Sequence, residues 1–241
     1  MNVSYSIIIL TFMKIVSLII PTYSKFPYLK NTVFELKKNF PQAEIIVVDD
    51  GSKDETSTIQ DIFGSQIVYL KNETNQGKGE SLRKGFKVAQ GDFLIFTDDD
   101  LPYGAEGISK ILNELENGHD LVIGVREEFY SDIFYKKIMR PFLYWIIFIL
   151  FGLKFPDTQC GLKGFQKETG KRLFSLSLAK GFAIDVEILY LAKKLGFKVK
   201  TIKVKQKDIA KSTFKMRGII KMFFEILKIR LHYYEINNKE K

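Results

Sequence analysis

Short apolar runs alternate with longer stretches, in which apolar residues recur every three or four positions, through the first half of the chain. The runs predict buried strands, and the longer stretches predict helices that cover a sheet. The predicted strands span residues 15–20, 45–48, 67–70, 93–96 and 121–123, and the predicted helices span residues 28–39, 55–63, 80–89 and 105–117. This alternation is typical of an α/β fold with a mostly parallel central sheet flanked by helices.

The pattern changes after Gly124, where residues 126–155 form a basic and aromatic stretch. Its apolar part, residues 142–153, fits either a core helix or a helix that faces a membrane. A turn-rich segment at 156–164 follows, and then a predicted helix at 186–195 and a predicted strand at 199–204. The end of the chain predicts a basic amphipathic helix, for which packing on the domain and lying in a bilayer interface both remain open.

The simplest domain organisation has one large unit, because no repeat, low-complexity tract or flexible linker interrupts the chain. We expect residues 14–215 to form this unit and residues 216–241 to form the C-terminal helix. Residues 1–13 are interpreted as an extension or an alternative start, since Met13 precedes the first strand directly. No run reaches the roughly 18 apolar residues of a spanning helix, so no transmembrane segment is expected.

Composition narrows the function classes. The 241 residues are 46% hydrophobic, which favours a folded domain, and Cys160 is the single cysteine, which excludes an internal disulfide and suits a reducing compartment. Residues 1–120 carry 12 basic and 17 acidic side chains, whereas residues 121–241 carry 25 basic and 11 acidic ones. The basic half suits a phosphorylated substrate, anionic lipid or nucleic acid, although solvated lysines explain most of these charges.

Asp98, Asp99 and Asp100 directly follow the predicted strand at 93–96. Open α/β sheets bind ligands at this end of their strands, and three adjacent carboxylates are most stable when a cation or solvent offsets their charge. The alternative is a solvated acidic turn. Because side chains alternate along an extended chain, Asp98 and Asp100 can face the same way while Asp99 points elsewhere. The cluster therefore predicts a divalent metal site made by Asp98 and Asp100.

Other strand ends carry residues suited to a nucleotide. Pro21 and Tyr23 end the first strand, Val48 and Asp50 end the second, and a Gly-Lys-Gly turn around Lys78 precedes the third helix. An aspartate can accept hydrogen bonds from a base or a ribose, and a tyrosine can stack on a base. The Gly-Lys-Gly turn is neither a dinucleotide fingerprint nor a Walker loop.

Taken in chain order, these motifs resemble the nucleotide-sugar half of family 2 glycosyltransferases with the GT-A fold. Residues 157–165, Asp-Thr-Gln-Cys-Gly-Leu-Lys-Gly-Phe, are similar to the branch with dolichyl-phosphate glucosyltransferase and dolichol-phosphate mannose synthase. The resemblance implies that Asp98 and Asp100 hold Mg²⁺ or Mn²⁺ on the donor diphosphate. Further donor contacts are implied for Pro21, Tyr23, Val48, Asp50, Lys78, Asp99, Lys211 and Ser212.

The resemblance also implies an acceptor side, with Arg126, Arg140 and Lys163 facing the acceptor phosphate. Asp157 and Glu187 are implied, together with Asp98 and Asp100, as catalytic residues, the first two by orienting the acceptor. A buried helix acid paired to a lysine is the alternative for Glu187. The chain departs from the family pattern at Ser24-Lys25, Asp99 and Pro102, which puts the donor's identity in doubt more than the reaction type.

The expected function is that of a metal-dependent inverting glycosyltransferase. It would move glucose or mannose from UDP-glucose or GDP-mannose to polyprenyl or dolichyl phosphate, as a peripheral protein on the cytoplasmic face of a membrane. One alternative keeps the transferase but gives it a soluble glycan acceptor. Another is a non-catalytic module that binds nucleic acid or lipid through the basic half, but no nucleic-acid recognition motif is present, so nucleic acid is not expected as a partner.

Overall fold

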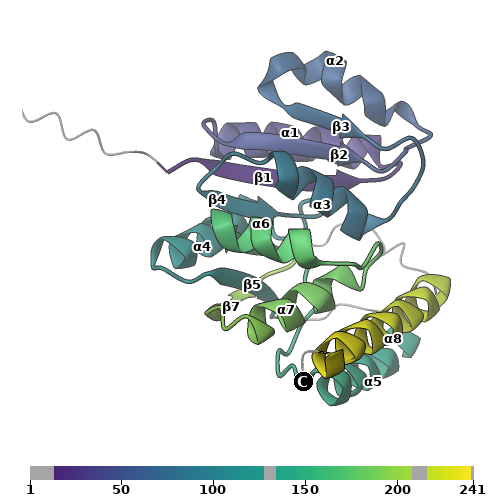
Figure 1. Cartoon of the computed structure of the whole chain (residues 1–241). Coiled ribbons are helices and arrows are strands. Elements are labelled where there is room, and N and C mark those ends of the chain that lie inside the picture. Colours follow the sequence, from purple (N-terminus) through teal and green to yellow (C-terminus); the bar gives the residue numbers. More distant parts are fainter. Residues whose placement is uncertain (1–13, 128–133, 208–215, 240–241) are drawn as a thin grey trace, which may run out of the picture.

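The computed structural model describes residues 14–127, 134–207 and 216–239. Within them, seven strands form one sheet in the order β3-β2-β1-β4-β6-β5-β7 (Figure 1). The strands are β1 (Val16–Thr22), β2 (Glu44–Asp49), β3 (Val68–Lys71), β4 (Phe93–Phe96), β5 (Leu121–Arg126), β6 (Lys163–Gln166) and β7 (Val199–Val204). All neighbouring pairs are parallel except those that involve β6, which confirms the predicted mostly parallel α/β sheet.

Helices cover both faces of this sheet. They are α1 (Phe26–Asn39), α2 (Ile59–Phe63), α3 (Lys78–Val88), α4 (Gly104–Glu116), α5 (Phe134–Phe151), α6 (Lys167–Leu176), α7 (Ile184–Lys194) and α8 (Met216–Lys239), with short 3-10 turns at Glu55–Thr58 and Gly64–Gln66. Alternate residues of β1 enter different cores: Leu18 packs with residues of α1 and α4, and Ile19 packs with residues of α3, α6 and α7. The result is a helix–sheet–helix sandwich with two apolar layers.

Two elements were not predicted. The sequence placed β6 inside a turn-rich segment and assigned nothing to α6. β6 lies antiparallel between β4 and β5, with Phe96 opposite Lys163 and Ile123 opposite the same lysine. β4 and β5 are therefore joined only through this later strand.

The C-terminal helix packs on the domain with one side, and a position in a bilayer interface stays a prediction for its other side. Met222, Ile226 and Ile229 of α8 lie buried in the same core as α3, α6 and α7, next to residues of α5 (Figure 1). The opposite sides of both helices expose large apolar side chains, namely Phe142, Trp145, Ile149, Phe224 and Leu231. None of the helices in the described residues is long and apolar enough to cross a membrane.

Candidate functional site

The strand ends bring distant residues to one edge of the sheet. β1, β2 and β4 run parallel, so their carboxyl ends lie together, and the antiparallel β6 begins where β4 ends. Asp50, Asp98 and the segment that leads into Lys163 therefore meet at this edge. A switch in strand direction at the carboxyl ends of parallel strands is the usual ligand-binding position of an open α/β sheet.

Asp98 is the central acid of this edge. Its side chain is 38% exposed, and its Oδ1 accepts a hydrogen bond from the Lys78 Nζ at 3.0 Å. On the other side it lies directly against Gly161, where a Cβ atom would stand only 1.8 Å from the Asp98 Oδ2. Position 161 therefore needs glycine, since any side chain would displace this carboxylate.

A chain of alternating charges runs inward from Asp98. Lys78 Nζ also lies 3.5 Å from the Asp185 Oδ2, and the other oxygen of Asp185 accepts a hydrogen bond from Lys163. Burial alone would lower the pKa of Lys78, but the carboxylates of Asp185 and Asp98 outweigh it and hold that pKa above its usual value. Lys78 therefore remains an ammonium and brings a fixed positive charge to the strand end.

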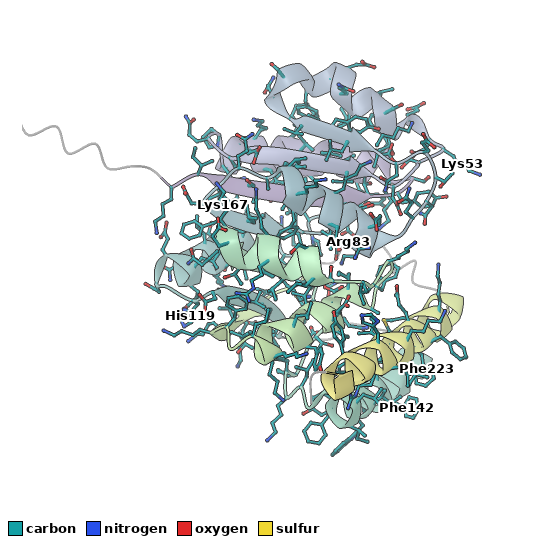
Figure 2. The ribbon with its side chains drawn as sticks, in the orientation of Figure 1. Lys53, Arg83, His119, Phe142, Lys167 and Phe223 are labelled. Atoms are coloured by element: carbon teal, nitrogen blue, oxygen red, sulfur yellow. The ribbon has the colours of Figure 1, made fainter. Side chains whose placement is uncertain are left out.

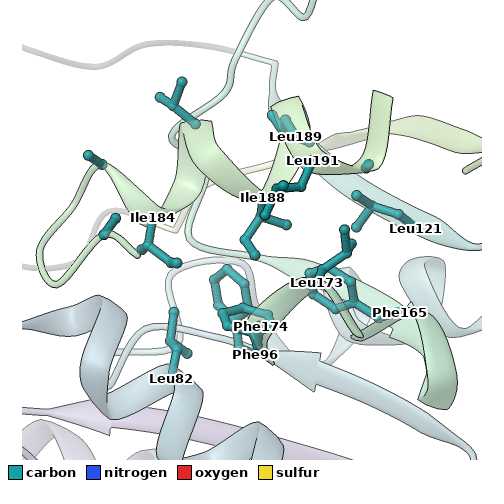
Figure 3. Packing of buried hydrophobic residues seen from close by; sticks show 14 of the residues in the cluster. Leu82, Phe96, Leu121, Phe165, Leu173, Phe174, Ile184, Ile188, Leu189 and Leu191 are labelled. Atoms are coloured by element: carbon teal, nitrogen blue, oxygen red, sulfur yellow. The ribbon is translucent and has the colours of Figure 1, made fainter. Parts of the chain in front are cut away.

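The buried part of this chain sits among aromatic side chains. The Nζ atoms of Lys78 and Lys163 lie 5.3 Å and 5.4 Å from the centre of the Phe96 ring. Figure 3 shows Phe96 beside Phe174, close to Leu82 and Ile184 from α3 and α7. The apolar packing shields the charges from water, so their attraction is stronger here than on the surface.

Lys163 corrects a prediction. The resemblance implied that it faces the acceptor phosphate, but its side chain is 0% exposed, and its Nζ donates to the Cys160 carbonyl at 2.7 Å as well as to Asp185. A buried lysine with these partners cannot touch an acceptor. Asp185, which the sequence did not single out, is the residue that holds both lysines, and it lies in the first turn of α7.

Asp99 points away from Asp98 and into the protein. Its carboxylate accepts a hydrogen bond from the Thr22 hydroxyl at 2.8 Å and pairs with the Lys25 Nζ at 3.4 Å. Burial raises the pKa of Asp99 to about 6, and the charge of Lys25 opposes this rise. Two of the departures from the family pattern, Lys25 and Asp99, are thus partners of one another, and Asp99 anchors the strand end instead of facing outward with Asp98.

Asp98 and Asp100 are the partly exposed acids of the cluster. Burial and the nearby charge of Asp98 raise the pKa of Asp100, so a positive ion beside the pair would stabilise its charged form. In the part of the chain that the structure describes, no three His, Cys, Asp or Glu residues are grouped to hold a metal alone. Mg²⁺ commonly takes one or two carboxylates together with substrate phosphates and water, and the Asp98–Asp100 pair fits that mode.

Asp50 holds the turn that precedes α3. Its two oxygens accept from the backbone N–H groups of Gln76 and Gly77, both at 2.8 Å, and from the Asn72 amide at 2.9 Å. Asp50 is buried, whereas Tyr23 at the end of β1 is exposed and accessible to a base. The predicted nucleoside contacts at Pro21, Tyr23, Val48 and Asp50 stay predictions, with Asp50 also fixing the Lys78 turn.

Arg126 and Asp157 form a close pair at the far side of the site. The guanidinium donates to both carboxylate oxygens, with Nε 2.7 Å from Oδ2 and Nη2 2.8 Å from Oδ1. Asp157 is buried, so this fork fixes the direction of the partly exposed arginine. Arg140 belongs to α5, but its side chain lies outside the described part, as do Lys211 and Ser212.

Glu187 lies inside the protein, in the first turn of α7, although it was predicted to orient the acceptor. It is fully buried, and its carboxylate accepts from the backbone N–H groups of Leu178 and Ala179 and from the Tyr233 hydroxyl. Burial raises its pKa, while these hydrogen bonds oppose the rise. Glu187 orders the 178–179 backbone in this structure, and its position gives no support to the predicted catalytic role. The alternative of a buried helix acid is therefore correct in its burial, but the partners in the described residues are backbone N–H groups and a tyrosine in place of a lysine.

The geometry agrees with the comparisons to known proteins. The family model described as "Glycosyl transferase family 2" matches residues 17–173, which contain all of β1 except its first residue, β2 to β6 and the whole acidic strand end. The chain belongs to glycosyl transferase family 2. The chain is therefore a glycosyltransferase, as the motifs predicted.

Individual relatives of this family 2 member are similar over most of its length. A dolichyl-phosphate beta-glucosyltransferase of Trichomonas vaginalis is 30% identical, covering 90% of this chain and 73% of the relative. A UDP-N-acetylglucosamine–dolichyl-phosphate N-acetylglucosaminyltransferase of Methanococcus voltae is 29% identical, covering 90% of this chain and 97% of the relative.

Solved structures confirm the GT-A fold. Glucosyl-3-phosphoglycerate synthase from Mycobacterium tuberculosis, crystallised with Mn²⁺, UDP and glucosyl-3-phosphoglycerate, superposes with a TM-score of 0.71. The match covers 92% of this family 2 chain and 80% of the synthase at 18% sequence identity, a similarity that shows the fold alone.

Proposed function

We propose that this glycosyltransferase moves a hexose from a nucleotide sugar to a polyprenyl or dolichyl phosphate and needs Mg²⁺ or Mn²⁺ to do so. The observation that carries the proposal is the strand-end arrangement of Asp98 and Asp100 beside the ammonium of Lys78. Two carboxylates and a fixed cation at one edge suit a metal-bound diphosphate. The names of the relatives support the lipid phosphate acceptor. The first name also supports glucose as the sugar, so UDP-glucose is the favoured donor, and GDP-mannose is the other predicted donor. The name of the Methanococcus voltae relative adds UDP-N-acetylglucosamine to the donors that must be tested.

In the proposed reaction, an oxygen of the acceptor phosphate attacks the anomeric carbon of the sugar. The bond from that carbon to the donor diphosphate breaks, its electron pair leaves with the diphosphate, and the configuration inverts. The attacking oxygen is already anionic near neutral pH, so positioning and charge stabilisation matter more than a general base. Asp98 and Asp100 would hold the metal, whose charge would stabilise the leaving diphosphate, and Lys78 would add a second positive charge there.

The acceptor phosphate would meet Arg126, whose planar fork is held in place by Asp157. Guanidinium groups bind phosphate oxygens well, because their planar geometry matches that of phosphate. Arg140 keeps its predicted role on the acceptor side.

The outer faces of α5 and α8 support the proposal that the protein binds a lipid surface. Trp145 and Ile149 of α5 and Phe224 of α8 are exposed, and Lys221 and Lys228 are exposed on α8. Figure 2 places Phe142 and Phe223 at this α5–α8 end of the molecule. Aromatic side chains interleaved with lysines are typical of helices that lie in the interface of an anionic bilayer. Peripheral attachment on the cytoplasmic face remains part of the proposal.

The test is a donor panel against a short polyprenyl phosphate, with and without chelator, read by mass spectrometry. We expect a glycolipid with one nucleotide sugar, loss of product with chelator, and loss of product in Asp100→Asn. Asp61→Asn, at an exposed position of α2, is the matched control and should keep full activity. Mn²⁺ binding by paramagnetic resonance adds a readout that is independent of turnover.

Two results would count against the proposal. Full activity in Asp100→Asn would remove the metal assignment. Absence of glycolipid with every donor, together with transfer to a soluble glycan, would replace the lipid acceptor by the soluble one.

A further inference from the structure

The loop of residues 177–183, between α6 and α7, is held through its backbone by three helices. Glu187 of α7 accepts from Leu178 and Ala179, and Arg83 of α3 donates to the Ala179 carbonyl at 2.8 Å. Figure 2 shows where Arg83 lies on the α3 side of this region. A loop whose N–H and C=O groups are bound this fully has a defined position.

The third helix is α8, and its contact is made by Glu225. One oxygen of Glu225 accepts from the N–H groups of Lys180 and Gly181, both at 2.7 Å, and the other accepts from Ala183 at 3.3 Å. A Cβ atom at position 181 would stand 2.8 Å from that second oxygen, so glycine allows the close approach. Hydrogen bonds to a charged acceptor are about twice as strong as neutral ones.

The same loop packs directly against the start of α3. The Lys180 carbonyl accepts from the N–H of Gly79 at 2.8 Å and of Glu80 at 3.3 Å. A Cβ atom at Gly77 would stand 2.4 Å from the Lys180 oxygen, and one at Gly79 would stand 2.2 Å from the Ala179 oxygen. The two glycines that flank Lys78 are therefore required by this contact, which assigns the Gly-Lys-Gly turn a packing role as well as a charge.

We infer that Glu225 is a positioning residue for the sugar donor. Through the 177–183 loop it fixes the first turn of α3, and so it fixes the direction in which Lys78 reaches Asp98. The inference rests on the proposed function, in which Lys78 contacts the donor diphosphate. It adds that a residue on the C-terminal helix, outside the segment that the family model matches, controls donor binding.

The experiment compares Glu225→Gln with Glu106→Gln, an acid-to-amide control on the exposed face of α4. Glutamine keeps the size of the side chain but loses the charge and one acceptor oxygen. In Glu225→Gln we expect the KM for UDP-glucose to rise about tenfold, as expected when charge-assisted hydrogen bonds are weakened. The KM for polyprenyl phosphate should stay constant. A purely structural role would lower the melting temperature without separating the two KM values.

Hydrogen exchange in the ligand-free protein supplies a readout that does not depend on activity. Glu225→Gln should speed exchange at residues 178–183 and also at residues 78–81, while Glu106→Gln should change neither. Two results for Glu225→Gln would overturn the inference. One is faster exchange at residues 178–183 without faster exchange at residues 78–81, and the other is an unchanged KM for UDP-glucose together with an unchanged KM for polyprenyl phosphate. If the wild type uses no nucleotide sugar, the proposed function fails, and exchange at residues 78–81 still decides whether Glu225 holds α3.

Gly79→Ala perturbs the same contact from the other side and serves if Glu225→Gln does not fold. Its methyl group must push the loop away from α3, so it should raise the KM for UDP-glucose while Glu225 is intact. An unchanged donor KM in a folded Gly79→Ala would also overturn the inference.

Discussion

Asp185→Asn should destabilise the fold measurably, because this aspartate is the shared partner of the buried Lys163 and the partly buried Lys78. Its oxygens accept from Lys163 and lie 3.5 Å from the Nζ of Lys78, and its side chain is 3% exposed. Asparagine has the same shape but no charge. Lys163 would then keep the neutral acceptors, namely the Cys160 carbonyl and the amide oxygen at position 185, but no charged partner, while Lys78 would keep Asp98.

The size of the effect follows from the cost of an uncompensated buried charge. Removing one partner of a buried ion pair costs about 3–5 kcal/mol, and the lower end applies since Lys78 retains Asp98. For a chain of 241 residues the unfolding entropy is roughly 0.5 kcal/mol per kelvin near the midpoint. A loss of about 3 kcal/mol therefore lowers the melting temperature by about 6 °C.

The assay is thermal and guanidinium unfolding followed by circular dichroism. Asp185→Asn is compared with Lys163→Met, with the double variant, and with Glu106→Gln, which breaks an exposed pair with Lys110. We expect the double variant to lose less stability than the sum of the single ones, by about 1 kcal/mol or more, because each single change leaves the other charge unpaired. A midpoint for Asp185→Asn equal to that of Glu106→Gln would refute this reasoning.

Three further outcomes can be checked with short experiments. Burial raises the pKa of Cys160 to about 11, so the thiol stays protonated near pH 8, and a disulfide reagent should label it only after guanidinium unfolds the protein. The free energy of folding that this protonated thiol contributes is lost as the pH rises through about 11. Fast labelling of the folded protein would contradict the burial. Gly161→Ala should lower transferase activity by about a hundredfold with an unchanged circular dichroism spectrum, since its Cβ displaces Asp98; normal activity would show that this approach is unimportant. Trp145→Glu should reduce flotation with anionic vesicles, whereas the same change at Phe34, a similarly exposed aromatic of α1, should not. Equal flotation of the two variants would show that α5 does not contact the lipid.

The sequence was sufficient to place the strand-end residues because the signals there are local. Buried strands, the acids that follow them and the Gly-Lys-Gly turn lie within a few residues of one another, so pattern and alternation placed Asp98 and Asp100 correctly at the sheet edge. Asp98 and Asp100 are partly exposed and Asp99 is buried, as predicted, but the reason differs: residues 99 and 100 lie in a turn, which the hydrogen bond from the Leu101 N–H to the Asp98 carbonyl at 3.1 Å closes, and not in an extended chain.

The errors arose where a residue's state depends on a distant partner. β6 is four residues long, includes a lysine and a glycine, and reads as a turn; it becomes a strand because β4 and β5 both offer it an edge. The family resemblance implied that Lys163 faces the acceptor, but Asp185 supplies the counter-charge that allows this lysine to be buried. Glu187 is likewise determined by Tyr233, which lies 46 residues further along the chain.

The position of β6 also constrains how the protein is made. As the chain leaves the ribosome, β1 to β5 emerge well before residues 163–166, yet β4 and β5 are linked only through that strand. Until then β4 presents an open hydrogen-bonding edge of apolar residues, the kind of edge that pairs with other chains. Asp98 meanwhile lacks Gly161 on one side and the Asp185–Lys78 pair on the other. A fragment that stops after β5 should therefore aggregate instead of forming an independent nucleotide-binding half, and splitting the gene there would yield two inactive pieces.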